Sequence, residues 1–299
     1  MLVYKTISIL IFVLFVAITY SQDTASKQIT TKALKDSVTI KKDTISVQDT
    51  LAVKDTLDIK KFIFRTLPNK AFDVGEKLVF DVRYGFITAG TAVMQIPKSE
   101  FHNGRKCYRV EFTVKSLPFF STFYKVEDKY VSLIDSAGIF PWRFEQYIRE
   151  GGYKRDFKAE FDHANNKAIT LEGEYTIEPY VHDIISAFYF NRIMDYSEMR
   201  GGTMMHLKNF YKDSTYNLNV RFRGRERISV KAGTFDCVIV EPIVEEGGLF
   251  KSEGIIHIWL TDDDKKIPVM VKSKILIGSI SAELVEYSGI KGKIQAKVK

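Results

Sequence analysis

The sequence has little of the chemistry that enzymes display in short motifs. It contains five histidines, at positions 102, 163, 182, 206 and 257, and none of them stands in the spacing of a metal site. It has no glycine-rich nucleotide loop and no G-x-S-x-G nucleophile elbow. We therefore expect neither a metal ion nor a cofactor, and the sequence favours a binding or a structural protein over an enzyme. A hydrolase whose residues meet only in the folded chain stays an alternative.

Cysteine is scarce as well, with only Cys107 and Cys237 in the chain. Between residues 107 and 114 the apolar side chains Tyr108, Val110 and Phe112 alternate with polar ones, which puts Cys107 on the opposite face of a strand. Export would permit a disulfide between the two cysteines. The alternation favours two unpaired thiols instead.

A concentrated positive charge is also missing. The formal net charge is +7, from 44 Lys and Arg against 37 Asp and Glu, but the basic residues are spread along the chain. The only dense group is at 221–227, where arginines alternate with other residues as on a solvated strand. We therefore do not expect a nucleic-acid partner.

Only one long apolar run occurs, at residues 7–17 behind Lys5. Thr19 and Ser21 supply the small residues of a signal-peptidase site, which predicts a secretory signal peptide at 1–21 with cleavage before Gln22. The run is short for a membrane span, so we expect an exported or periplasmic protein without a stable transmembrane segment after cleavage. An uncleaved anchor is the alternative, and the lack of a nearby cysteine argues against a lipoprotein.

Residues 22–61 contain no glycine, no proline and no aromatic residue, and an Asp-Ser/Thr-apolar triplet recurs four times in them. Such a polar tract buries too little surface to fold, so we predict a flexible tether, with a partner-docking arm as the alternative. Residues 62–290 are predicted to form one β-rich domain, and residues 291–299 a basic tail.

What the sequence does contain is strand-like alternation. The clearest examples are 76–84 and 216–223, where apolar and polar residues take turns throughout. About a dozen such segments joined by short turns predict an all-β fold, with a curled or barrel-like antiparallel sheet. A split near residue 200 into two smaller sheets is the alternative. The predicted strands are 76–84, 91–96, 105–115, 125–134, 141–149, 153–161, 168–173, 216–223, 227–231, 235–241, 254–261, 267–276 and 279–287.

One helix is predicted near 181–196, with Asp183 as its N-cap. Its apolar residues cover most of the circumference, so we expect the helix to lie inside or across the curled sheet. Residues 117–124 also break the alternation, because four aromatic residues crowd into a short segment.

Two sets of aromatic residues are candidates for function. The first set would line a cavity for a lipid or acyl chain, although the same residues could instead fill a solid core. It comprises Phe80, Tyr84, Trp142, Phe144, Phe188, Tyr189 and Trp259. The second set either caps the sheet or forms an exposed lip that contacts a membrane or an envelope protein. It comprises Phe119, Phe120, Phe123 and Tyr124.

Four ordered stretches resemble a family of exported bacterial proteins, the domain of unknown function 3108 (DUF3108). They are GEKLVFDVRYG at 75–85 with AGTA at 89–92, DIISAFY at 183–189, GTFDC at 233–237, and IWLTDDD at 258–264 with IPV at 267–269 and GSISAEL at 278–284. The resemblance implies a curled antiparallel β-structure of the cell envelope and supplies no catalytic residues. The hairpin at 258–269 also resembles, more weakly, periplasmic lipoprotein carriers, which hold acyl chains in a half-open barrel.

Overall fold

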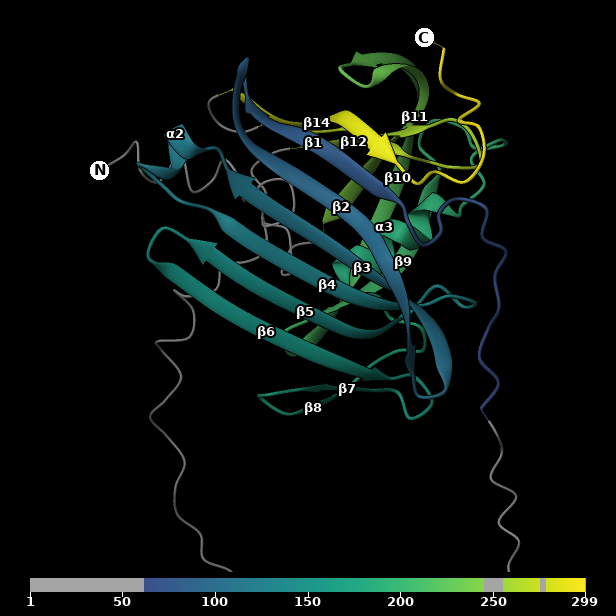
Figure 1. Cartoon of the computed structure of the whole chain (residues 1–299). Coiled ribbons are helices and arrows are strands. Elements are labelled where there is room, and N and C mark those ends of the chain that lie inside the picture. The colour runs from purple at the N-terminus through teal and green to yellow at the C-terminus, as the bar shows by residue number, and fades with distance from the viewer. Residues whose placement is uncertain (1–61, 245–254, 275–277, 299) are drawn as a thin grey trace, which may run out of the picture.

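The computed structural model describes residues 62–244, 255–274 and 278–298, and within them the chain forms a single antiparallel sheet of 14 strands (Figure 1). The sheet curls around helix α3 and is not closed. The predicted signal peptide and tether lie outside the described residues. The all-β, curled antiparallel fold expected from the alternation is confirmed.

The chain runs through the sheet in two meanders. The first contains β1 (Lys77–Tyr84), β2 (Ile87–His102), β3 (Arg105–Ser116), β4 (Glu127–Asp135), β5 (Pro141–Glu150), β6 (Tyr153–Asp162), β7 (Lys167–Thr170) and β8 (Glu174–Thr176). A short helix, α2 (Pro118–Ser121), lies between β3 and β4, and α3 (Ile184–Arg192) follows β8. The second meander contains β9 (Met204–Tyr211), β10 (Ser214–Val230), β11 (Gly233–Val244), β12 (Ile256–Thr261), β13 (Pro268–Lys274) and β14 (Ser279–Ser288).

The two meanders join at the middle of the sheet, where the first strand pairs with the last. Phe80 of β1 lies opposite Leu284 of β14. The strand order is therefore β8-β7-β6-β5-β4-β3-β2-β1-β14-β13-β12-β11-β10-β9, with β8 and β9 at its edges. At the β9 edge, Asn209 forms a single parallel bridge with His182, which directly precedes α3. The sheet is continuous, so the alternative of two separate sheets does not hold.

Several boundaries differ from those predicted. β8 and β9 were not predicted from the sequence, because β8 has only three residues and the apolar residues of β9 do not alternate. The predicted strands 216–223 and 227–231 are one strand, β10, whose register shifts at a bulge between Phe222 and Gly224. Gly224 has a φ of +140°, a conformation that suits glycine and lets the strand continue past the bulge.

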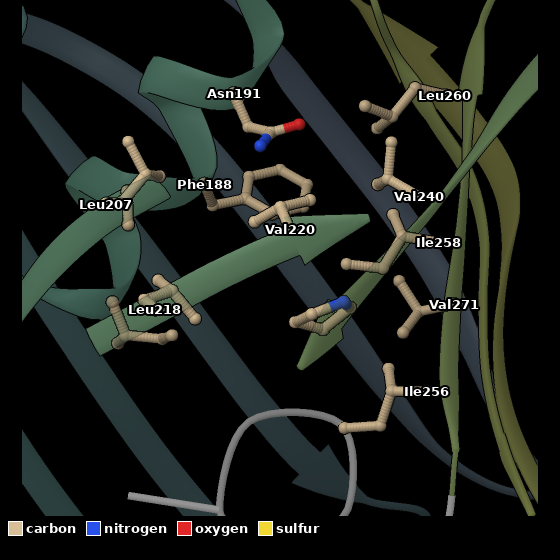
Figure 2. A pocket seen from close by; sticks show the side chains of 13 residues that line it. Phe188, Asn191, Leu207, Leu218, Val220, Val240, Ile256, Ile258, Leu260 and Val271 are labelled. Atoms are coloured by element: carbon tan, nitrogen blue, oxygen red, sulfur yellow. The ribbon is translucent and has the colours of Figure 1, made fainter. Parts of the chain in front are cut away.

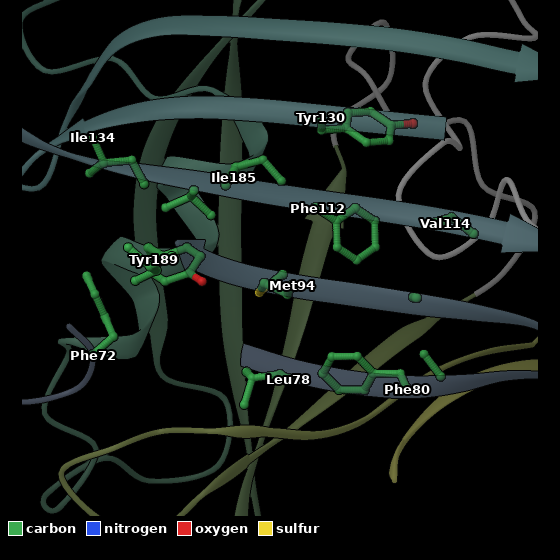
Figure 3. Close-up of a cluster of buried hydrophobic side chains, with 14 of the residues drawn as sticks. Phe72, Leu78, Phe80, Met94, Phe112, Val114, Tyr130, Ile134, Ile185 and Tyr189 are labelled. Carbon is green, nitrogen blue, oxygen red and sulfur yellow. The ribbon is translucent and has the colours of Figure 1, made fainter. Parts of the chain in front are cut away.

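The main core lies between α3 and the first meander (Figure 3). On β1 every second residue, at Leu78, Phe80 and Val82, is buried, as alternation requires. From the helix, Ile185 and Tyr189 are fully buried against this surface. The prediction that α3 lies inside the curl of the sheet is thus confirmed. Within the described residues, no helix is both long enough and apolar enough to cross a bilayer.

Buried polar contacts hold the first turn of α3. The Asp183 carboxylate caps the helix by accepting from the backbone N–H groups of Ile185 and Ser186, at 2.7 and 2.9 Å. Its other oxygen accepts from the hydroxyl of Ser132 on β4, at 2.7 Å. Burial raises the pKa of Asp183 to about 6, against the opposing effect of these hydrogen bonds.

The last turn of α3 is held by a buried ion pair. Arg192 donates to both carboxylate oxygens of Glu76, at 2.6 and 2.7 Å, and to the backbone oxygen of Lys265, at 3.1 Å. Burial lowers the pKa of Arg192, but the adjacent Glu76 carboxylate outweighs burial and the net shift is upward. Since each end of α3 is fixed to a different part of the sheet, the helix presents a defined face to the second meander.

The C-terminal residues also pack on the sheet. Ile294 and Ala296 are buried, and the backbone oxygen of Ala296 accepts from the N–H of Asp236 on β11, at 2.9 Å. Lys297 forms a bridge with Phe235.

Candidate functional site

An apolar cavity lies between α3 and the second meander (Figure 2). The helix contributes Ile184, Ala187, Phe188 and Asn191, which follow the i, i+3, i+4, i+7 spacing of one helix face. The core-facing residues Ile185 and Tyr189 lie on a different face of the same helix. The helix therefore separates the packed core from the cavity.

The opposite wall of the cavity consists of aliphatic side chains on neighbouring strands. Alternate residues of β12, Ile256, Ile258 and Leu260, point to the same side, as do Leu218 and Val220 of β10. Four further residues complete the wall: Leu207, Val240, Pro242 and Val271. The space measures about 720 Å³, including the part open to solvent. The cavity itself measures about 80 Å³, which is smaller than a site that encloses a whole drug-sized ligand, and the rest of the space is open to solvent.

Asn191 is the one polar side chain of this lining. The hydroxyl of Tyr196 donates to the side-chain oxygen of Asn191, and it lies 3.2 Å from the Asn191 backbone oxygen. The amide oxygen is thus engaged, and the amide nitrogen of Asn191 is the group that can donate to a ligand. No charged side chain lines this cavity in the described part of the chain.

A second, smaller cavity of about 20 Å³ lies toward β1, β2 and β3. Its lining comprises Phe80, Ala92, Met94, Phe112, Phe188, Pro268, Val271 and Ala282. Phe188 and Val271 line the first cavity as well. The two spaces are therefore neighbours, with the Phe188 side chain at their border.

The structure brings only two of the seven predicted cavity aromatics to these spaces. Phe188 lines both cavities and Phe80 lines the smaller one. Phe144 is buried in the main core, and Tyr189 is fully buried with its hydroxyl 3.4 Å from Glu76. Tyr84 packs instead against the small cluster of Ala89 and Ile280.

The two tryptophans serve other parts of the molecule. Trp142 of β5 lies at the register shift between Leu133 and Ile134 of β4. It packs with Cys107 and Leu133, and its indole N–H donates to Asp135 at 3.1 Å. Trp259 alternates with the cavity residues of β12 and so lies on the opposite face. Its indole N–H donates to Glu226 at 2.9 Å.

The predicted lip divides into exposed and packed residues. Phe119 and Phe123 are 70% and 62% exposed, and their rings contact each other at 5.6 Å. Phe120 packs on the cluster of Ala89 and Ile280, and Tyr124 packs on the main core. Sequence reasoning missed Phe86, in the β1–β2 turn, which is 86% exposed. The backbone bond from Leu117 N to Ala89 O places α2 beside this hairpin.

A serine, a histidine and an aspartate meet at the start of α3, although not in the manner of a hydrolase. The Ser186 hydroxyl lies 3.2 Å from Nδ1 of His182 and donates to the backbone oxygen of Asp183 at 3.1 Å. All three residues are buried, and the carboxylate caps the helix rather than orienting the imidazole. Burial also lowers the pKa of His182 far below its ordinary value. The arrangement is that of a helix cap.

A buried acidic pair lies on the concave side of β4 and β5. Asp128 and Glu150 are both buried, and one oxygen of Asp128 accepts from the backbone N–H of Arg149 at 2.8 Å. Burial, together with the negative charge of Asp128, raises the pKa of Glu150 to about 8. The pair can therefore share a proton at neutral pH.

The two cysteines are free and buried. Burial raises the pKa of each thiol to about 12, with smaller contributions from neighbouring carboxylates. Each thiol therefore stays protonated and unreactive at neutral pH.

Three solved structures are similar to this chain. A β-barrel-like protein of domain of unknown function DUF1849 from Brucella abortus shares 9% identity and a TM-score of 0.46, over 72% of this chain and 97% of its own. A candidate lipoprotein from Parabacteroides distasonis shares 10% identity and a TM-score of 0.33, over 76% and 100%. A candidate exported protein with a YmcC-like fold from Bacteroides fragilis shares 11% identity and a TM-score of 0.31, over 76% of this chain and 100% of its own.

No curated protein matches this chain. The family described as "Protein of unknown function (DUF3108)" matches residues 79–285, which include every strand from β2 to β13 and parts of β1 and β14. This match agrees with the four stretches that resembled the family in the sequence. The chain belongs to the DUF3108 family.

Proposed function

We propose that this protein is an exported binding protein that holds a hydrophobic ligand, such as the acyl chain of a lipid, between α3 and the second meander. The observation that carries this proposal is the apolar lining of the cavity, in which Asn191 is the one polar residue among the described ones. A lining of this polarity favours an apolar ligand, because each methylene transferred from water contributes about 0.8 kcal/mol. Export rests on the signal-peptide pattern of residues 1–21.

A cavity-filling variant tests the proposal. Ile258 is partly exposed to the cavity, so Ile258→Trp places a larger side chain in the space that the ligand would occupy. Native mass spectrometry of the mature protein, purified from its own envelope, should show a bound lipid with the unmodified chain. With Ile258→Trp the occupancy should fall at least roughly tenfold, since a bulky ring replaces buried ligand methylenes.

The matched control is Ile239→Trp. Ile239 is also a partly exposed isoleucine, on the neighbouring strand β11, but it pairs with Trp259 on the face away from the cavity. The control should retain the lipid. A ligand-free mass for the unmodified chain, with no binding of added lipids, would overturn the proposal, and so would an equal loss in both variants.

A second role is favoured by the exposed aromatics beside α2. We propose that Phe86, Phe119 and Phe123 contact a lipid surface, where aromatic rings are stable at the boundary of the acyl region. Lys115 and Lys125 flank α2, their side chains are 62% and 67% exposed, and within the described chain both pair with Glu127 alone. The flank therefore keeps a positive charge, which complements anionic headgroups.

Vesicle sedimentation tests this surface. The double variant Phe119→Ser and Phe123→Ser should bind vesicles of phosphatidylethanolamine and phosphatidylglycerol roughly tenfold more weakly, because two apolar rings no longer enter the bilayer. Phe101→Ser is the control, since Phe101 is 77% exposed near the other end of β2. Unchanged vesicle binding in the double variant would refute the contact with a lipid surface and leave an envelope protein as the partner of these aromatic residues.

A further inference from the structure

Phe188 occupies a position that no other residue of the described chain shares. It lines the larger cavity and the smaller one, and it packs against the main core as well as against the second hydrophobic cluster, around Val220, Phe222 and Leu260. Figure 2 shows its ring projecting from α3 into the larger cavity. The side chain is partly buried, so part of its surface faces the cavity while the rest packs on the two clusters.

The two cavities lie on either side of this ring. The larger one extends along β10 and β12, and the smaller one lies among Phe80, Met94 and Phe112 of the first meander. Val271 of β13 borders each of them, which gives the two spaces a common floor next to Phe188. Rotation of a phenylalanine side chain between its staggered positions is enough to open or close such a border.

The chemistry of the lining indicates the ligand class. An elongated apolar chain fits two adjoining apolar spaces better than a compact ring system, which would have to fit one of them. Within the described lining, Asn191 offers an amide N–H and no cation is present. An uncharged head with a carbonyl oxygen, such as an ester, can accept from that amide, whereas a free carboxylate would be buried without a counter-charge.

We infer that Phe188 is a movable partition that limits the length of acyl chain the protein can hold, and that chains longer than the larger cavity reach the smaller one only when this ring moves aside. The inference rests on the proposed function, because it concerns the same cavity. It makes Phe188 a residue that determines specificity for chain length rather than one that is needed for binding as such.

The experiment measures affinity against chain length. The probes are monoacylglycerols with saturated chains from octanoyl to stearoyl, and binding is followed by native mass spectrometry and by competition with a fluorescent fatty-acid ester. For the unmodified protein the affinity should rise about fourfold per methylene and then level off where the larger cavity is full. In Phe188→Ala the levelling-off should move to longer chains, so that the stearoyl ester binds roughly tenfold more tightly than to the unmodified protein.

The control variant comes from the same helix. Phe190 is a partly buried phenylalanine of α3 that packs against His182 and Arg65 and does not line the cavities. Phe190→Ala should keep the chain-length limit of the unmodified protein. Circular dichroism and thermal unfolding identify any variant that fails to fold, and Phe188→Leu then replaces Phe188→Ala as the milder reduction in size.

The outcomes separate the two proposals. If no monoacylglycerol binds to the unmodified protein, the proposed function fails. If the esters bind but the chain-length limit is the same with phenylalanine, leucine and alanine at position 188, the cavity is real and the partition is refuted. A limit that moves equally in Phe190→Ala would also refute it, because a general loosening of α3 would then explain the change.

Discussion

At the scale of single residues, the buried acidic pair of Asp128 and Glu150 is costly, because two carboxyl groups are held away from water. Both carboxyl groups are buried, and one oxygen of Glu150 has no hydrogen-bond partner among the described residues. Tyr130 and Gln146 are the buried polar neighbours on the same strands. A second negative charge here would be destabilising, which keeps a proton on the pair at neutral pH.

This proton makes stability depend on pH. The pKa of Glu150 is about 8 in the folded protein against an ordinary value of 4.5, so the folded state binds the proton more tightly. The stabilisation is complete below pH 4.5 and is lost as pH rises from there through about 8. We expect the free energy of unfolding, measured in urea, to fall by on the order of 5 kcal/mol across this range.

Glu150→Gln should flatten that dependence, because a neutral amide has no proton to lose. Glu172→Gln, at an exposed site between β7 and β8, should leave the slope unchanged. A slope that stays the same in Glu150→Gln would assign the proton to another group.

At the scale of elements, the position of α3 decides whether a cavity exists. The ion pair of Glu76 and Arg192 fixes its last turn, and both side chains are buried. Removing one member leaves the other charge buried without its partner. Arg192→Met should therefore lower the free energy of unfolding by about 3–5 kcal/mol, as measured by chemical denaturation.

An exposed pair provides the comparison. The Nζ atom of Lys167 lies 2.8 Å from Oε2 of Glu174, and both side chains are half exposed or more. Lys167→Met should cost less than about 1 kcal/mol, since solvent screens a surface pair. Similar losses for both variants would mean that the buried pair does not anchor the helix.

The helix and most strands could be predicted from the sequence because their signals are local. Asp183 is the N-cap, as expected, and β1 shows the predicted alternation. The cavity could not be found in the same way. The prediction favoured large aromatic residues, yet Trp142 and Trp259 bury their rings elsewhere, and aliphatic residues such as Ile258 form the wall. Their alternation was visible, but which face meets the helix depends on the curl of the sheet.

At the scale of the whole molecule, the order of the strands in the sheet could not be predicted from local sequence patterns. Alternation predicts that neighbouring strands pair in a meander, and it says nothing of the pairing between β1 and β14 that joins the two meanders. It also gave no sign of β9, whose Met205, Phe210 and Tyr211 are buried without regular spacing. The curl that brings β9 beside the start of α3 depends on contacts between distant segments, such as the bridge from His182 to Asn209.

The pairing of the first strand with the last also bears on how the chain acquires its structure. Leu78 of β1 pairs with Tyr287 of β14, so the centre of the sheet cannot assemble until the last strand of the domain has been synthesised. Contacts this distant in sequence slow folding, because the entropy of closing a long loop is lost before any pairing compensates for it. A chain that stays unfolded for this long remains threadable, the state that a translocation channel requires.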